Sequence, residues 1–353
     1  MAQFAEAHFF LIESVVKIIV VLFVLLTAVA YVVWLERKVV ARIQSRWGPY
    51  WVGPHGLLQP LADGLKFLFK EDIVVQDADK VIYWMAPFLA FTLAFLSIAV
   101  IPFGGSFQLF GHTIQLQITD LNVGLLYVFA VTSLGVYSIA LAGWSANSKY
   151  PLFGGLRSSA QMISYELSLG LGVVGVLMIS GTLSLRGVVT PQVGFWHIAG
   201  IPFLPRWNVF RQPLGFLVYF IAAIAETNRI PFDLPEGETE LVGGFHTEYS
   251  SFKFAMFFIA EYANMVTVSC LATLLFFGGW LGPLFGPYWL RVILPVIWFC
   301  LKVFCFLFFY IWMRGTLPRF RYDQLMAFGW KVLLPLGFLN VLGTSFVIAW
   351  LHS

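Results

Sequence analysis

The sequence predicts an all-α polytopic membrane protein: a helix bundle with about eight transmembrane helices and one amphipathic interfacial helix. Of its 353 residues, 59% are hydrophobic and only 11% are charged, and the mean hydropathy is +0.84. Soluble domains contain about 25% charged residues, so this chain has too few charges to cover a surface that faces water. Lipid must therefore be its main solvent.

Eight apolar segments approach or exceed the roughly 20 residues that a helix needs to cross a bilayer. The fifth segment is the shortest. The predicted spans are 10–35, 81–102, 121–144, 157–181, 213–227, 251–280, 290–313 and 325–350. We expect one membrane domain over 1–353, made of helix 1 (1–35), a cytoplasmic segment with the amphipathic helix (36–80), helices 2–5 (81–227), an acidic cytoplasmic loop (228–250) and helices 6–8 (251–353).

The distribution of Lys and Arg predicts the orientation in the membrane. The segments that follow helices 1, 3, 5 and 7 hold fifteen of these residues, and the opposite side holds five. Basic residues accumulate in cytoplasmic loops, so these segments are expected to face the cytoplasm. An even number of spans then places both termini on the outer side.

The connection after helix 1 has the pattern of an amphipathic helix. Apolar residues recur at helical spacing from Leu58 to Phe69, whereas Asp63 and Lys66 fall on the other face. Such a helix lies in the membrane interface. A simple interfacial anchor would account for this pattern equally well.

Two other features are expected to carry no chemistry. Cys270, Cys300 and Cys305 lie within apolar runs without a C-x-x-C pair or a nearby His, so we interpret them as buried apolar side chains, with no metal site. The outer stretch 182–212 is interrupted by prolines and glycines, and we expect a lid.

Three ionisable residues fall inside predicted spans: Glu166, Glu261 and Lys302. A charge at the centre of a bilayer costs about 2.5–3.5 kcal/mol on insertion scales. At 1.5 Å per residue, all three lie about 14–18 Å from the cytoplasmic ends of their helices, so they are expected to share one layer. A static ion triad is one interpretation. A proton relay is the favoured one, since burial moves such groups toward exchange near neutral pH.

An acidic loop follows the fifth span. Two prolines and a glycine prevent a continuous helix there, and Glu236, Glu238 and Glu240 alternate, which sets them on one side of an extended chain. A solvated loop would look the same. However, Glu226 ends the preceding span and Glu261 lies in the next, so the loop is expected to feed a polar path into the membrane.

Eight segments in this order resemble one known family. They are Glu36–Lys38, Arg46–Pro49, Gly56–Asp63, Gly143–Tyr150, Ser164–Leu167, Ala225–Glu240, Ala260–Asn264 and Pro318–Met326. The family is the H-type membrane subunit of respiratory complex I (NADH-quinone oxidoreductase), the counterpart of mitochondrial NADH dehydrogenase subunit 1. The stretch 182–212 and the C-terminus carry no family signature.

The resemblance implies a place at the heel of the membrane arm of this respiratory-chain translocase, in a bacterial cytoplasmic (inner) membrane with both termini periplasmic. Such a subunit forms much of the chamber through which quinone (ubiquinone or menaquinone) enters from lipid. The implied quinone path consists of Arg37, Arg46, Asp63, Phe232, Arg314 and Arg319.

The resemblance also implies an acidic channel that links quinone reduction to proton-pumping, antiporter-like subunits. Its implied members are Glu36, Glu166, Glu226, Asp233, Glu236, Glu238, Glu240, Glu248, Glu261 and Lys302. The chain itself would bind no cofactor and no metal, and quinone would be its substrate. NADH, FMN and the iron–sulfur clusters would belong to partner subunits. The expected partners are peripheral-arm subunits on the cytoplasmic side, other membrane-arm subunits and lipid, without nucleic acid.

Other functions share part of this pattern. A secondary ion transporter would explain the buried charges, but no inverted repeat with matched broken helices is present. An equivalent subunit of a membrane-bound hydrogenase-type complex is closer. A purely structural anchor would not need charges in the bilayer.

Overall fold

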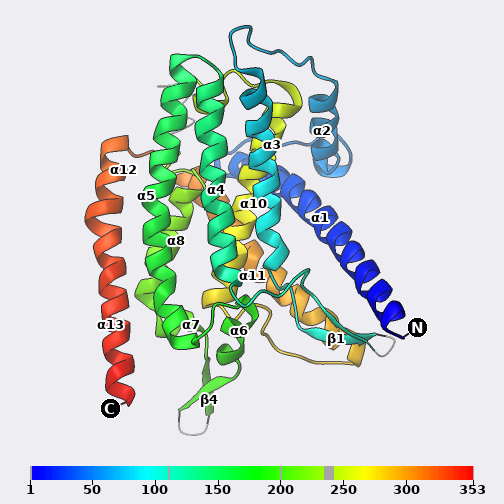
Figure 1. Cartoon of the computed structure of the whole chain (residues 1–353), viewed down its shortest axis with the longest axis vertical. Helices are drawn as coiled ribbons and strands as arrows, with labels where there is room; N and C mark the ends of the chain where they lie inside the picture. The colour runs from blue at the N-terminus through cyan, green and yellow to red at the C-terminus, as the bar shows by residue number, and fades with distance from the viewer. Residues whose placement is uncertain (1, 110–111, 199–200, 234–241, 353) are drawn as a thin grey trace.

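The computed structural model describes residues 2–109, 112–198, 201–233 and 242–352. Long helices stand side by side, and α1 leans away from the others (Figure 1). In the described ranges seven helices are long and apolar enough to cross a membrane, and α8 is a shorter apolar helix. The predicted helical membrane bundle is therefore confirmed.

The bundle helices match the eight predicted segments, with different ends. They are α1 (Ala2–Ile43), α3 (Lys80–Leu96), α4 (Gly124–Ser145), α5 (Lys149–Ser180), α8 (Pro213–Glu226), α10 (Ser251–Phe276), α11 (Tyr288–Thr316), α12 (Tyr322–Phe328) and α13 (Leu334–His352). A π-helical turn, Gly329–Leu333, joins α12 and α13 into one span.

Two helices extend further into the charged segments than the apolar runs predict. The first is expected to end at residue 35 but continues to Ile43, and α5 begins at Lys149 instead of residue 157. Glu, Arg and Lys are good helix formers, so a charged run at the end of a span does not stop the helix. Glu36 and Arg37 therefore project from a regular helix.

Close packing in the bundle depends on small residues. A Cβ atom on Gly172 of α5 would lie 2.9 Å from the Tyr219 nitrogen and 3.0 Å from the Gly215 oxygen of α8. Helices that pack in lipid gain contact where small residues let their backbones approach. Tyr219 is itself fully buried at this contact.

The short elements lie at one end of the bundle, at the bottom of Figure 1. Within the predicted lid, Gln192 donates hydrogen bonds to the Leu274 and Leu275 carbonyls at the end of α10 (2.9 and 3.4 Å). The stretch 182–212 is thus fixed to the bundle. The elements are β1 (Ser106–Leu109), β2 (His112–Gln115), α6 (Leu185–Val189), the 3₁₀ turns Ser97–Val100 and Thr190–Gln192, β3 (Phe195–Ile198), β4 (Ile201–Pro205) and α7 (Asn208–Arg211). Each pair of strands forms an antiparallel hairpin.

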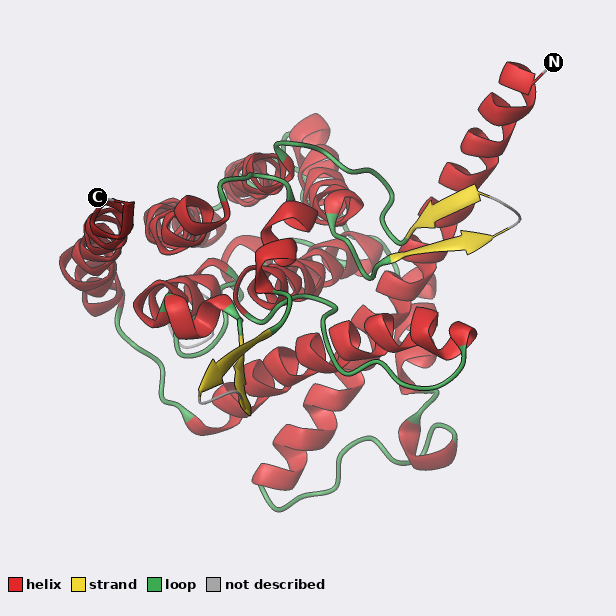
Figure 2. Ribbon diagram, turned by 90° about the horizontal axis from the view of Figure 1, so that it is seen from below, coloured by secondary structure: helices red, strands yellow, loops and turns green. Residues whose placement is uncertain are grey.

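The opposite end carries the amphipathic helix α2 (Gln59–Phe69), as predicted. The 3₁₀ turn Pro54–Gly56 precedes it, and the 3₁₀ turn Gly244–His246 lies before α10. Seen along the bundle, α1 and α13 lie at opposite edges (Figure 2). The side chains of α2 that face outward include Leu61 and Leu68, which are well exposed. This is the arrangement expected of a helix in the membrane interface.

Gly172→Ala tests the α5–α8 contact. Overpacking a close contact costs about 1–3 kcal/mol, so the variant is expected to lower the thermal midpoint of the purified protein in detergent. Gly170→Ala is the matched control, because no atom lies within 4 Å of its Cβ position. Equal midpoints for the two variants would contradict the packing argument.

Candidate functional site

The first feature of the site is a buried carboxylate, Glu36, near the C-terminal end of α1. Tyr262 of α10 donates a hydrogen bond to its Oε2 atom (2.8 Å). Its Oε1 atom pairs with the Arg314 guanidinium of α11 and lies 3.7 Å from Nη1 of Arg229. Glu36 is only 6% exposed. Two cations and a hydroxyl thus surround one buried carboxylate.

Arg229 joins this carboxylate to a second one. Its Nε atom lies 2.9 Å from Oε1 of Glu261 in α10, and its guanidinium carbon lies 4.2 Å above the Tyr262 ring. The side chain is buried. The sequence places Arg229 within a family segment but predicts no role for it. The one indication in the sequence that Arg229 pairs with carboxylates was its position as a basic residue in an otherwise acidic loop.

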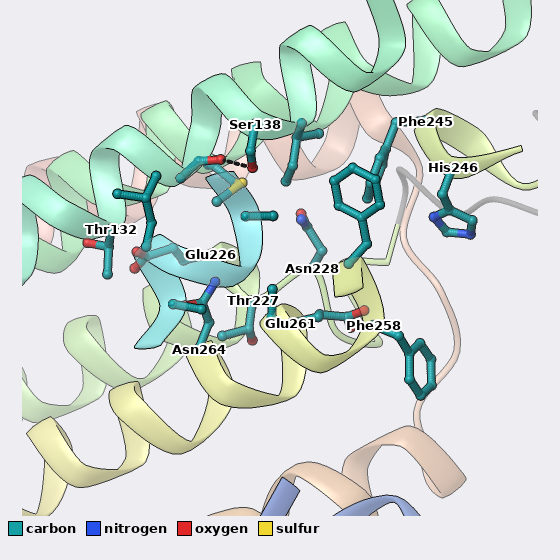
Figure 3. A pocket seen from close by; sticks show the side chains of 18 of the residues that line it. Thr132, Ser138, Glu226, Thr227, Asn228, Phe245, His246, Phe258, Glu261 and Asn264 are labelled. Atoms are coloured by element: carbon teal, nitrogen blue, oxygen red, sulfur yellow. Dashed lines mark hydrogen bonds between the residues drawn. The ribbon is translucent and has the colours of Figure 1, made fainter. Parts of the chain in front are cut away.

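A cavity follows directly behind Glu261. Its wall includes Glu226 at the end of α8, Asn228, and Asn264 of α10. In Figure 3 the side chains of Glu226 and Asn264 point into the same space. The cavity therefore brings together two of the predicted relay carboxylates, Glu226 and Glu261, with amide groups between them.

Glu166 lies beside this cavity on α5. Ser133 of α4 donates a hydrogen bond to its Oε1 atom, and the neighbouring Thr132 is in the cavity wall. Glu166 also interacts electrostatically with Glu226. These contacts extend the series of carboxylates from α1 and α10 to α5.

Lys302 does not join the two glutamates, and the expected layer of three charges is wrong in this respect. Its Nζ atom donates hydrogen bonds to the carbonyls of Phe277, Gly279 and Leu281 (2.8, 2.9 and 2.7 Å). These carbonyls follow the C-terminus of α10, at the end with the β-hairpins. A flexible lysine stem carries its charge away from the bilayer centre, and the carbonyls at a helix end lack partners of their own. The static ion triad is therefore not formed.

A second cavity lies between α1, α10, α11 and the segment after α1, and its volume is about 540 Å³. Ligand pockets have volumes of about 300–1,000 Å³. Its wall contains Arg37, Arg46 and Arg314 together with Glu36 and Tyr262. Three of the predicted quinone-path residues thus share one cavity with a predicted relay carboxylate.

Asp63 of α2 reaches the rim of this cavity through Arg37. Nη1 of Arg37 lies 2.6 Å from Oδ2 of Asp63, and Gln59 donates a hydrogen bond to Oδ1 (3.0 Å). Burial raises the pKa of Asp63, but the Gln59 hydrogen bond and the Arg37 charge outweigh it and hold the pKa below its usual value. The carboxylate is therefore ionised at neutral pH.

Asp233, Arg319 and Phe232 form a separate group. Nη2 of Arg319 lies 3.1 Å from Oδ2 of Asp233, and the Phe232 ring stacks on that of Phe320 (5.6 Å between centroids). Among the described residues these three are in the wall of neither cavity. They hold the loop after α8 against the segment after α11.

The remaining predicted residues are in or near the acidic loop. Glu236, Glu238 and Glu240 lie outside the described residues. The Glu248 carbonyl accepts a hydrogen bond from Tyr83 (2.6 Å).

His246 is a cavity residue that sequence reasoning missed. It is in the wall of the cavity with Glu226, beside the rings of Phe245 and Phe254. Burial lowers its pKa to about 4, although the charge of Asp233 acts in the opposite direction. The imidazole is therefore neutral at physiological pH. A lone His in a loop with many glutamates gave no periodic pattern by which to find it.

The described residues include no group of three or more His, Cys, Asp or Glu that could hold a metal ion. Cys270 is buried, whereas Cys300 and Cys305 are exposed on α11. The interpretation of all three as buried side chains is thus right for Cys270 only.

The chain is similar over nearly its whole length to known proteins. The model of a family described as NADH dehydrogenase matches residues 16–345. The second of the NADH-quinone oxidoreductase H subunits of Koribacter versatilis is 59% identical, over 96% of this chain and 98% of its own length. The H subunit of Thermomicrobium roseum and the first H subunit of Geobacter sulfurreducens are 53% and 51% identical, each over 96% of this chain and over 97% and 95% of their own lengths. These matches confirm the resemblance that the motifs indicated.

The lowered pKa of His246 predicts a pH dependence of stability. Between about pH 4 and 6.5 the unfolded chain binds a proton at this imidazole and the folded chain does not, so the free energy of unfolding falls as the pH is lowered through this window. At 1.36 kcal/mol per pKa unit, the loss is roughly 3 kcal/mol. Thermal midpoints from pH 8 to pH 4 measure it.

In His246→Gln this part of the pH dependence is expected to disappear. His55→Gln, at an exposed imidazole, is the matched control and is expected to behave like the parent. A parental slope in His246→Gln would show that this imidazole is not buried in the neutral form.

Proposed function

Because this chain belongs to the NADH dehydrogenase family, we propose that it is the H-type membrane subunit of a proton-translocating NADH-quinone oxidoreductase, where it forms much of the quinone-access chamber. The names of its relatives favour this role over a hydrogenase-type complex or a secondary transporter. Electrons come from NADH through FMN and iron–sulfur clusters of peripheral-arm partners. The protein lies in a bacterial cytoplasmic membrane with both termini periplasmic, an orientation that the Lys and Arg distribution supports.

The cavity with Arg37, Arg46 and Arg314 is the proposed quinone path. Quinone reduction takes up two electrons and two protons, so negative charge develops at the headgroup oxygens before protons arrive. Guanidinium groups stabilise such charge. The apolar side chains Val33, Val40 and Phe258 in the same wall suit a prenyl tail. Asp63 fixes the direction of Arg37 through its ion pair.

The proposed proton relay begins where this cavity ends. Glu36 is in its wall and lies 3.7 Å from Arg229, which in turn pairs with Glu261 in the wall of the cavity that contains Glu226. This bridge by Arg229 is the observation that carries the proposal. A change of charge at the quinone alters the electrostatic balance of Glu36 and Arg229, and Arg229 transfers that change to Glu261.

From Glu261 the polar groups continue to Glu226 and then to Glu166, which interacts electrostatically with Glu226 and accepts a hydrogen bond from Ser133. These partly buried carboxylates exchange protons when the charge beside them changes. Asp233, Glu248 and the loop residues Glu236, Glu238 and Glu240 are proposed to supply protons from the cytoplasmic side. Phe232 and Arg319 hold this loop in place. Lys302 is proposed to contribute only by holding the loop after α10, through its hydrogen bonds to the carbonyls of that loop.

Glu166→Gln tests the relay. In the assembled oxidoreductase in proteoliposomes, the variant is expected to lower coupled quinone reduction by about tenfold or more, in the range of lost acid–base groups. Glu13→Gln removes a carboxylate that pairs with Lys17 in the outer part of α1 and is the matched control. Parental turnover and proton pumping by assembled Glu166→Gln would rule out the relay.

A photoreactive quinone analogue tests the quinone path. We expect it to label α1 and α2 beside Arg37 and Asp63, because these residues lie at the rim of the arginine cavity. Peptides from the digested protein are identified by mass spectrometry, with excess unlabelled quinone as the competitor. Labelling confined to α5, α8 or α13 would place the quinone elsewhere.

A further inference from the structure

The helix α2 is held to the bundle in an unusual way. It lies wholly in the described part of the chain and has no buried residue. Leu61, Leu65 and Leu68 are all exposed, and its ring contact with the bundle is that of Phe67 with Phe254 of α10 (6.1 Å between centroids). With so little apolar packing, its place beside the arginine cavity depends largely on polar contacts.

The C-terminal end of α2 is bound by the first residue of α10. The Ser251 hydroxyl donates to the carbonyls of Phe67 and Lys70 (3.0 and 2.8 Å). Carbonyls at a helix C-terminus have no partner within the helix. Ser251 has φ of +53°, a left-handed conformation that is uncommon for a residue other than glycine. Such a conformation persists where surrounding contacts determine it.

The segment after α2 is bound by the same part of the chain. Ser250 accepts a hydrogen bond from the Ile73 nitrogen (2.8 Å) and donates one to the Ile73 carbonyl (3.1 Å). Nζ of Lys253 lies 2.9 Å from Oδ1 of Asp72. Backbone and charge contacts thus join 67–73 to 250–253.

Lys253 is the centre of this contact. It is only 3% exposed, and its ammonium group lies 4.1 Å from the Trp84 ring and 4.5 Å from the Tyr83 ring of α3. Aromatic faces stabilise a desolvated cation, and Asp72 balances its charge. Removing one partner of a buried pair leaves the other charge without compensation, so the contact is sensitive to single substitutions.

The end of the acidic loop belongs to the same group. Tyr83 donates to the Glu248 carbonyl (2.6 Å) and stacks on Tyr249 (4.3 Å between centroids). Tyr249 in turn shares a hydrogen bond with Ser145 of α4 (3.0 Å). The residues that surround Lys253 thus hold both the α2 connection and the loop segment 248–250.

We propose that the Asp72–Lys253 ion pair is a positioning link that makes α2 and the end of the acidic loop move as one body. Resting on the proposed function, this link joins the position of the helix at the quinone path to the loop that supplies protons. Lys253 contacts no quinone and transfers no proton. It acts by holding these two segments together. The alternative is that the ion pair only stabilises the first turn of α10. In that case α2 and the acidic loop would move independently of each other.

Hydrogen exchange in the assembled oxidoreductase tests the link without turnover. Lys253→Met is expected to speed amide exchange about fivefold or more in peptides that cover 67–73 and also in those that cover 244–250. Peptides from 149–180 are expected to be unchanged. Lys70→Met, which removes an exposed cation of the same segment, is the matched control. Faster exchange in only one of the two segments, or in neither, overturns the proposal.

Asp72→Asn provides a second, milder variant, because this side chain is about a third exposed. It is expected to speed exchange in the same two segments, and the double variant Asp72→Asn/Lys253→Met to add nothing further, since coupled residues are not additive. Lys253→Arg keeps the charge and the ring contacts and is expected to restore parental exchange. Additive effects would mean that the two residues act separately.

A kinetic measurement separates positioning from simple loss of structure. Lys253→Met is expected to raise the KM for a short-chain quinone about threefold while kcat changes less, because α2 borders the quinone path. An unchanged KM together with faster exchange would mean that the segments are linked but that α2 does not border the path. In that case the link stands on the exchange data, and the placement of the quinone path beside α2 is wrong.

Discussion

The structure depends on a buried arginine between a buried glutamate, Glu36, and a partly buried one, Glu261. A guanidinium group removed from water is stable only where carboxylates and other acceptors surround it, and Arg229 has Glu36 on one side and Glu261 on the other. Because these carboxylates belong to α1 and α10, the loop after α8 is fixed to two helices far away in the sequence. The charged network and the helix arrangement therefore require each other.

The two ends of the bundle use polar groups in opposite ways. At the end with α2, carboxylates and guanidinium groups surround two cavities. At the end with the hairpins, Lys302 and Gln192 satisfy the carbonyls that follow α10. Satisfied backbone groups leave no demand for water. This asymmetry favours a polar path that enters from one side and runs within the bundle over one that crosses it.

The sequence predicted the spans well because the length of an apolar run is a local property. The sequence did not predict the contacts of side chains whose partners are distant along the chain. Nothing near Glu36 in the sequence shows that Arg314 pairs with it, so the burial of this carboxylate is not predicted. Counting residues gave the depth of the Lys302 backbone, but the direction of a long flexible side chain depends on which acceptors lie nearby. Arg229 was missed for a related reason: a basic residue in an acidic loop looks solvated until the fold surrounds it.

The position of the amphipathic helix α2 is set mainly by polar contacts, and the membrane environment gives the reason. Apolar side chains that face lipid gain the same free energy at many positions along the membrane surface, since lipid tails impose no particular register. An ion pair such as Arg37–Asp63 acts over one short distance and in one orientation. The leucines of α2 therefore keep the helix in the membrane, whereas Asp63 and the contacts of Ser251 determine where it lies. Asp63 in the middle of α2 and Ser251 at its C-terminal end thus hold the helix beside the arginine cavity without a buried residue of its own.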